Sequence, residues 1–182
     1  MSPENPARVF AVGVNHKSGS AFLRDRLFVD EEMLPEFYGR LARESIGQAI
    51  VLSTCDRGEI QGAHPDPERA VSVIHEFFRG IGGSDAETLD HALYAHFDDA
   101  AVRHLMAVAS SLDSQVIGEP QVLGQVKESH RQSQSFGMVG PELDGGLQGA
   151  YNVAKRVRNE TEIGRRPVSI AAAVAQLVRD IH

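Results

Sequence analysis

Apolar residues change their spacing about half-way along the chain. In the first half, short apolar runs at residues 9–14 and 49–52 have the length of strands and end in turn-forming residues. Between them, apolar residues from 33 to 41 recur at the spacing of a helix. The remaining elements expected in this half are a weaker strand from Glu59, a helix from Pro67 and a strand near residues 93–95. This order predicts a small sheet with helices on one face.

From about Asp98 the pattern predicts helices only. Asp98 or Asp99 can cap a first helix, and a loop from Ser114 to Pro120 follows that helix. Three further helices are expected over residues 121–135, over the regular apolar stripe at 143–157, and over 168–181 after Pro167. The predicted fold class is therefore α+β, with the sheet in the first half and helices alone in the second.

Composition and charge narrow the class of protein. With 42% hydrophobic and 24% charged residues, the chain is neither a disordered tail, a collagen-like fibre nor a coiled coil. The single cysteine excludes an internal disulfide and points to a reducing, cytoplasmic compartment, and no apolar run approaches the about 20 residues of a membrane span. Because the net charge is −7, a nucleic-acid partner would need a local basic patch, and residues 155–166 are the candidate.

Cys55 is the first candidate for chemistry. It follows an apolar strand, at the kind of strand end where sites on sheets collect. A lone cysteine is more often an inert core residue, but Cys55 has polar neighbours. Arg57 favours the reactive thiolate, whereas the adjacent Asp56 carboxylate disfavours it. The residues alone leave both roles open.

Two other segments could contribute to a site. His104 is placed within a predicted helix, where it is either a hydrogen-bonded, half-buried histidine or an acid–base group. Residues 114–125 are either a loop with a helix start or a polar wall for a small ligand. No histidine has metal-ligand spacing, so no metal site is predicted. Neither G-x-G-x-x-G nor a Walker loop occurs, so the chain has no recognisable dinucleotide motif.

Four strings of residues together resemble the N-terminal catalytic region of glutamyl-tRNA reductase. They are Gly13-Val14-Asn15-His16-Lys17-Ser18, Leu52-Ser53-Thr54-Cys55, residues 109–125, and residues 154–164. The resemblance covers nearly the whole chain. It implies a ferredoxin-like α/β subdomain over residues 1–97, a helical subdomain over 98–166, and the start of a long spinal helix over 167–182.

The resemblance also implies a chemistry. Cys55 would attack the ester of glutamyl-tRNA to form a thioester, which NADPH would reduce to glutamate-1-semialdehyde for 5-aminolevulinate and tetrapyrrole synthesis. His104 matches a histidine important for activity, and Arg57 is the natural partner for the glutamate side-chain carboxylate. The positions that match substrate-binding residues are Thr54, Asp56, Arg57, Ser114, Glu119, Pro120, Gln121 and Gln125.

The sequence departs from the family pattern in several places. Asp56 stands where the family has Asn, and Gly58 and Gln61 replace residues that are usually Thr and Tyr. The NADPH-binding and dimerisation domains have no counterpart here, so reduction is not expected from this chain alone. The implied partners are glutamyl-tRNA, a second copy in the full-length homodimer, and glutamate-1-semialdehyde aminomutase.

Two alternatives to the reductase remain. One is a stand-alone hydrolase or transferase that forms the thioester from an aminoacyl-tRNA without reducing it. The other is a non-catalytic relative that binds tRNA or a full-length reductase, an alternative to which Asp56 gives some weight.

Overall fold

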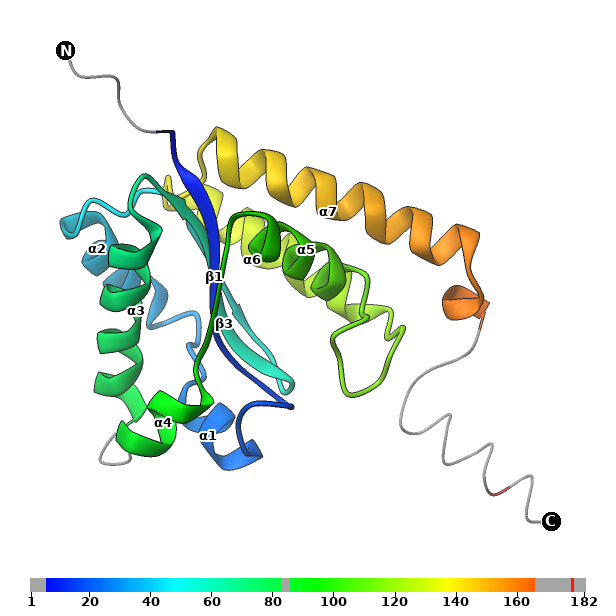
Figure 1. The fold of residues 1–182 in the computed structure, drawn as a ribbon, viewed down its shortest axis with the longest axis horizontal. Coiled ribbons are helices and arrows are strands. Elements are labelled where there is room, and N and C mark those ends of the chain that lie inside the picture. Colours follow the sequence, from blue (N-terminus) through cyan, green and yellow to red (C-terminus); the bar gives the residue numbers. More distant parts are fainter. Residues whose placement is uncertain (1–5, 83–85, 166–177, 179–182) are drawn as a thin grey trace.

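A four-stranded antiparallel sheet forms the centre of the protein (Figure 1). The computed structural model describes residues 6–82, 86–165 and 178. The strand order is β2-β3-β1-β4, and the strands are β1 (Arg8–Asn15), β2 (Ala49–Ser53), β3 (Arg57–His64) and β4 (Tyr94–Phe97). This mixed architecture confirms the predicted fold class, and β3 begins two residues before the expected strand.

Helices connect the strands and fill the second half of the described chain. They are α1 (Ala21–Arg26), α2 (Leu34–Arg43), α3 (Pro67–Gly82), α4 (Ala86–Ala92), α5 (Asp98–Ala109), α6 (Gln121–Ser135), α7 (Pro141–Glu160) and the short 3-10 helix η1 (Glu162–Arg165). The apolar pattern did not predict α1, α4 or η1. The final helix expected over 168–181 lies, apart from Val178, outside the described residues. Among the described residues, no helix is both long and apolar enough to cross a membrane.

The sheet separates two hydrophobic cores because successive strand residues point to opposite faces. Phe10 and Val12 of β1 pack with the core that includes Phe37 of α2. Ala11, between them, belongs to the other core, together with Leu105 of α5. Figure 1 shows α2 and α3 on one side of the sheet and α5, α6 and α7 on the other. The predicted sheet with helices on one face is therefore correct only for the first half of the chain, because the later helices cover the second face.

The pairing of β1 with β3 is unusually close at one position. Gly13 lies opposite Glu59, and a Cβ atom built on Gly13 would lie 2.3 Å from the carbonyl oxygen of Gly58. Any side chain at residue 13 would force the two strands apart, so glycine is required there.

The start of α5 differs from the prediction. Phe97 occupies the N-cap position and no side chain caps the helix, so the expected capping by Asp98 or Asp99 is wrong. Instead, the Arg8 Nε atom donates a hydrogen bond of 2.9 Å to the Asp98 carboxylate. This ion pair fixes the start of α5 against β1.

Candidate active site

Cys55 lies at the tip of the hairpin that joins β2 to β3. The Thr54 amide donates to the Arg57 carbonyl oxygen at 2.8 Å, which closes a four-residue turn. The Thr54 hydroxyl accepts hydrogen bonds of 3.2 Å from the amides of both Asp56 and Arg57. Thr54 therefore shapes the turn, and Cys55 is exposed at its tip rather than sealed in the core.

The Arg24 side chain of α1 holds this turn by hydrogen bonds. Its Nε atom donates to the Cys55 carbonyl oxygen at 3.0 Å, and one terminal nitrogen donates to the Gly19 carbonyl oxygen at 2.7 Å. Arg24 is itself buried. The guanidinium thus links the backbone of the cysteine to the loop that follows β1, a role that sequence reasoning missed.

A small cavity of about 90 Å³, which we name the thiol pocket, opens beside Cys55. Its lining residues are Leu52, Thr54, Cys55, Asp56, Arg57, Ser114, Glu119, Gln121, Val122 and Gln125. Every predicted site residue except His104 and Pro120 is among them. Ser114 is 5% exposed, and its buried hydroxyl has no hydrogen-bond partner among the described residues. An unpaired buried hydroxyl on a pocket wall is suited to a polar ligand.

The loop that carries Ser114 is held against the hairpin. One Asp56 carboxylate oxygen accepts the amide of Gln115 at 3.0 Å. Further along, Gly118 has a φ of +87°, and a Cβ on it would lie 2.9 Å from the side chain of Ile163. Pro120, which does not line the thiol pocket, occupies the N-cap position of α6.

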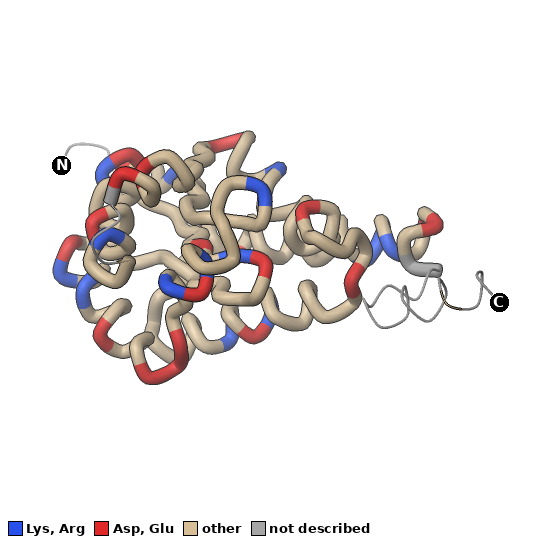
Figure 2. Tube along the Cα trace, turned by 90° about the horizontal axis from the view of Figure 1, so that it is seen from below, with Lys and Arg blue, Asp and Glu red and all other residues tan. Residues whose placement is uncertain are grey.

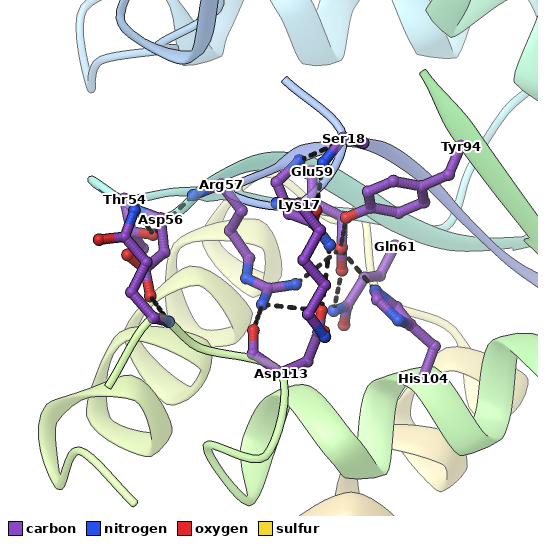
Figure 3. A network of polar contacts seen from close by, with 12 residues as sticks. Lys17, Ser18, Thr54, Asp56, Arg57, Glu59, Gln61, Tyr94, His104 and Asp113 are labelled. Atoms are coloured by element: carbon purple, nitrogen blue, oxygen red, sulfur yellow. Dashed lines mark hydrogen bonds and ion pairs between the residues drawn. The ribbon is translucent and has the colours of Figure 1, made fainter. Parts of the chain in front are cut away.

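Arg57 is the centre of a buried network of charges (Figure 3). Its side chain is 2% exposed and lies 3.1 Å from carboxylate oxygens of both Glu59 and Asp113. It also donates to the backbone carbonyl of Asp113. Burial alone would lower the pKa of Arg57, but the two carboxylates raise it, so the guanidinium stays charged. In the structure Arg57 contacts the carboxylates of Glu59 and Asp113. Its expected contact with a carboxylate of the substrate stays a prediction.

Glu59 joins Arg57 to His104. The fully buried carboxylate accepts hydrogen bonds from Tyr94 and Gln61 and lies 2.6 Å from His104 Nε2. Burial would raise the pKa of Glu59, but His104 and Arg57 lower it to about 2. Burial and the Glu59 charge raise the pKa of Tyr94 well above 10, so Tyr94 remains a donor. His104 therefore lies behind Arg57, outside the lining of the thiol pocket.

Asp113 ties this network to the loop after β1. The same carboxylate that contacts Arg57 accepts from Lys17 Nζ at 2.5 Å and from the side-chain Nδ2 of Asn15 at 3.1 Å. Burial would raise the pKa of Asp113, but Lys17 and Arg57 lower it. Sequence reasoning missed both Asp113 and Glu59. For Glu59 a signal existed, since Arg57, Glu59 and Gln61 alternate along one face of a strand.

A larger hollow of about 570 Å³, which we name the groove, adjoins the thiol pocket. The two share Leu52, Gln121 and Gln125 as walls. The groove runs between α6 and the segment that links α1 to α2. In the part of the chain that the structure describes, no Lys or Arg lines the groove, and Arg57 is the only such residue on the walls of the two hollows.

The structure also bears on metal binding and on the predicted basic cluster at residues 155–166. Within residues 6–82, 86–165 and 178, no group of three or more His, Cys, Asp and Glu residues could hold a metal ion. Figure 2 shows acidic and basic residues interspersed along the chain. In the predicted basic cluster, Arg156 pairs with Glu160 at 3.1 Å, and residue 166 lies outside the described part.

Comparison with known proteins identifies the family. A sequence model described as "Glutamyl-tRNAGlu reductase, N-terminal domain" matches residues 12–161. The chain belongs to this family. Two relatives named glutamyl-tRNA reductase, from Rhodospirillum rubrum and from a Marinomonas species, are 41% identical over 171 residues and 39% identical over 174 residues. The matches cover 94% and 95% of this chain, but only 40% and 41% of those relatives.

A solved structure has the same fold. It is titled as a glutamyl-tRNA reductase from Methanopyrus kandleri, and it superposes with a TM-score of 0.73 at 24% sequence identity. The match covers 97% of this chain and 40% of that chain. The resemblance stated from the sequence motifs is thus confirmed at the level of family and fold, and the chain corresponds to the N-terminal region of the reductase.

Proposed function

We propose that this chain is the acyl-accepting catalytic region of a glutamyl-tRNA reductase. The observation that carries the proposal is the exposed Cys55 thiol at a hydrogen-bonded hairpin tip. It lies next to a pocket lined by Arg57 and by Ser114, whose buried hydroxyl is unpaired among the described residues. A thiol held beside polar groups is suited to nucleophilic attack on an activated acyl group.

In the proposed step, the Cys55 thiolate attacks the carbonyl carbon of the glutamyl ester. A carbon–sulfur bond forms, the bond between that carbon and the ribose oxygen breaks, and the leaving oxygen takes up a proton. The products are a glutamyl thioester on Cys55 and free tRNA. Because the turn fixes the Cys55 backbone through Thr54 and Arg24, the sulfur is positioned before the substrate arrives.

The walls of the thiol pocket suit the charges of a glutamyl residue. Its ammonium group can pair with the carboxylates of Asp56 or Glu119, and its side-chain carboxylate can take the donors that Arg57 and Ser114 present. His104 acts on Arg57 through Glu59 rather than on the reacting atoms.

The described residues do not fit NADPH. A dinucleotide diphosphate is held by cations or by a glycine-rich helix start, but no described Lys or Arg lies on the walls of the groove. The hydride that reduces the thioester to glutamate-1-semialdehyde for tetrapyrrole synthesis must therefore be supplied by another part of the longer enzyme. Dimerisation, a partnership with glutamate-1-semialdehyde aminomutase and a cytoplasmic location belong to the same proposal.

The test is acyl transfer without NADPH. We expect the chain, incubated with glutamyl-tRNA labelled in its glutamate, to retain label that is released by hydroxylamine. Cys55→Ser should retain no such label, and since Cys55 is the single cysteine, the label reports on that residue alone. Rapid release of free glutamate would support the hydrolase alternative. Binding of tRNA without any label would overturn the proposal in favour of a non-catalytic relative.

A further inference from the structure

Lys17 joins the buried charge network from the solvent side. Its Nζ atom lies 2.5 Å from one oxygen of the Asp113 carboxylate, and the other oxygen lies 3.1 Å from Arg57. The Lys17 side chain is 63% exposed, whereas that of Arg57 is 2% exposed. The two cations therefore share one carboxylate, and Figure 3 shows both pointing toward Asp113.

The loop after β1 holds Lys17 in this place. Asn15 Oδ1 accepts hydrogen bonds from the amides of Lys17 at 2.9 Å and Ser18 at 3.1 Å. Asn15 Nδ2 donates to Asp113 at 3.1 Å, so one residue fixes both the loop and the carboxylate. A salt bridge to an exposed lysine contributes little to stability. Stability alone therefore does not account for this arrangement.

Lys17 changes the charge that surrounds Arg57. The guanidinium contacts the carboxylates of Glu59 and Asp113, and the pKa of each is lowered, so both are charged at neutral pH. Two anions on one guanidinium weaken its attraction for a third carboxylate. Lys17 offsets the charge of Asp113, and it adds one positive charge to the network whether or not His104 is protonated. Arg57 thus keeps its attraction for a carboxylate.

The composition of the thiol pocket makes this added charge important. The carboxylates of Asp56 and Glu119 line the pocket, and Arg57 is the only described Lys or Arg on its walls. These acids suit the ammonium group of a glutamyl residue, but they oppose its side-chain carboxylate. Lys17 does not line the pocket, so it acts through Asp113 and Arg57 rather than by touching the substrate.

We propose that Lys17 is a specificity-determining residue, which favours an acyl group with a side-chain carboxylate by neutralising Asp113 beside Arg57. This inference rests on the proposed function. The discriminating comparison is between glutamate and glutamine as the acyl group, because a carboxylate and a primary amide have nearly the same shape and differ in charge.

The test uses one tRNA that carries either glutamate or glutamine, each labelled in the amino acid. Because the tRNA is the same, any contact between Lys17 and the tRNA cancels in the ratio of the two rate constants for acylation of Cys55. Lys17→Met removes the charge, and Lys17→Arg retains it. A double variant, Lys17→Met with Asp113→Asn, removes both charges of the pair. Lys155→Met, at an exposed residue that lines neither hollow, is the control.

We expect the wild type to react faster with the glutamyl than with the glutaminyl ester. Lys17→Met should lower this ratio about tenfold, the effect of one uncompensated charge close to the carboxylate of the substrate. Lys17→Arg and Lys155→Met should keep the ratio of the wild type. The double variant should recover most of the ratio, because an amide at residue 113 leaves no charge to be offset.

Failures of the two proposals are distinguishable. If the wild type is not acylated by either ester, the proposed function fails. If the wild type is acylated but Lys17→Met keeps its ratio, the role of Lys17 is refuted while the function stands. An equal loss with both esters would also refute it, because Lys17 would then support the loop or the tRNA. A double variant with as low a ratio as Lys17→Met would contradict the charge argument.

Discussion

The buried Glu59 carboxylate offers the sharpest test of the charge network. Glu59→Gln keeps the size of the side chain and removes the charge that both Arg57 and His104 contact, so that Arg57 keeps Asp113 as its remaining ion-pair partner. Removing one member of a buried ion pair costs about 3–5 kcal/mol. A second route gives a similar figure, since a carboxyl whose pKa falls from 4.5 to about 2 on folding contributes about 3 kcal/mol at neutral pH.

The direction in which the free energy of unfolding changes with pH follows from the same pKa. Because the folded pKa of Glu59 lies below its unfolded value, the stabilisation is complete above about pH 4.5 and is lost as the pH falls towards about 2. The wild type should therefore lose its greater stability relative to Glu59→Gln as the pH falls through this range.

Urea unfolding followed by circular dichroism measures this difference, at neutral pH and at steps down through the acid window. Glu160→Gln is the matched control, since Glu160 pairs with Arg156 on the exposed face of α7, and its change should stay within about 0.5 kcal/mol. The reasoning is refuted if Glu59→Gln is as stable as the control variant. It is also refuted if the difference from the wild type persists unchanged at acid pH.

Three further substitutions have defined outcomes. Asp56→Asn removes the negative charge beside Cys55, so thioester formation measured by labelling should become faster; slower labelling would count against the charge argument. Gly118→Ala, at a φ of +87°, should destabilise the chain by about 1–3 kcal/mol in urea, whereas Gly145→Ala in α7 should stabilise it by about 0.5–1 kcal/mol; equal effects would contradict this. Arg24→Ala removes one hydrogen bond to the Cys55 carbonyl oxygen and one to the Gly19 carbonyl oxygen, so acylation of Cys55 should slow while tRNA binding persists. An unchanged acylation rate would refute the positioning role of Arg24.

The sequence pattern predicted most elements but was weakest at β3. Apolar runs marked β1 and β2 because their residues face hydrophobic cores on both sides. In β3 three of the residues facing the later helices, Arg57, Glu59 and Gln61, are polar yet buried, and only Ala63 at the far end of that face is apolar. A strand that buries charges has no apolar alternation, so its start could not be recognised. The arrangement of α5 to α7 on the second face depends on contacts between distant segments, which local spacing does not report.

The candidate site was predictable only in part, for a similar reason. Thr54, Cys55 and Arg57 lie within four consecutive residues, so the sequence shows that they are close together. The loop that begins at Ser114 was linked to them by the family resemblance and not by the local pattern of residues. Asp113 and Arg24 reach the turn from other elements, and nothing in their sequence surroundings shows it.

The buried charges also argue for a function at this place in the fold. A well-packed apolar cluster between sheet and helices would be at least as stable as ion pairs that lose their hydration. Here Arg57 is instead enclosed by Glu59 from its own strand and Asp113 from the loop after α5. These two carboxylates hold the guanidinium on the wall of the thiol pocket and keep it charged. Under the proposed function, a fixed guanidinium beside Cys55 would bind the carboxylate of the acyl group, and the position given to Arg57 would explain the energetic cost of the network.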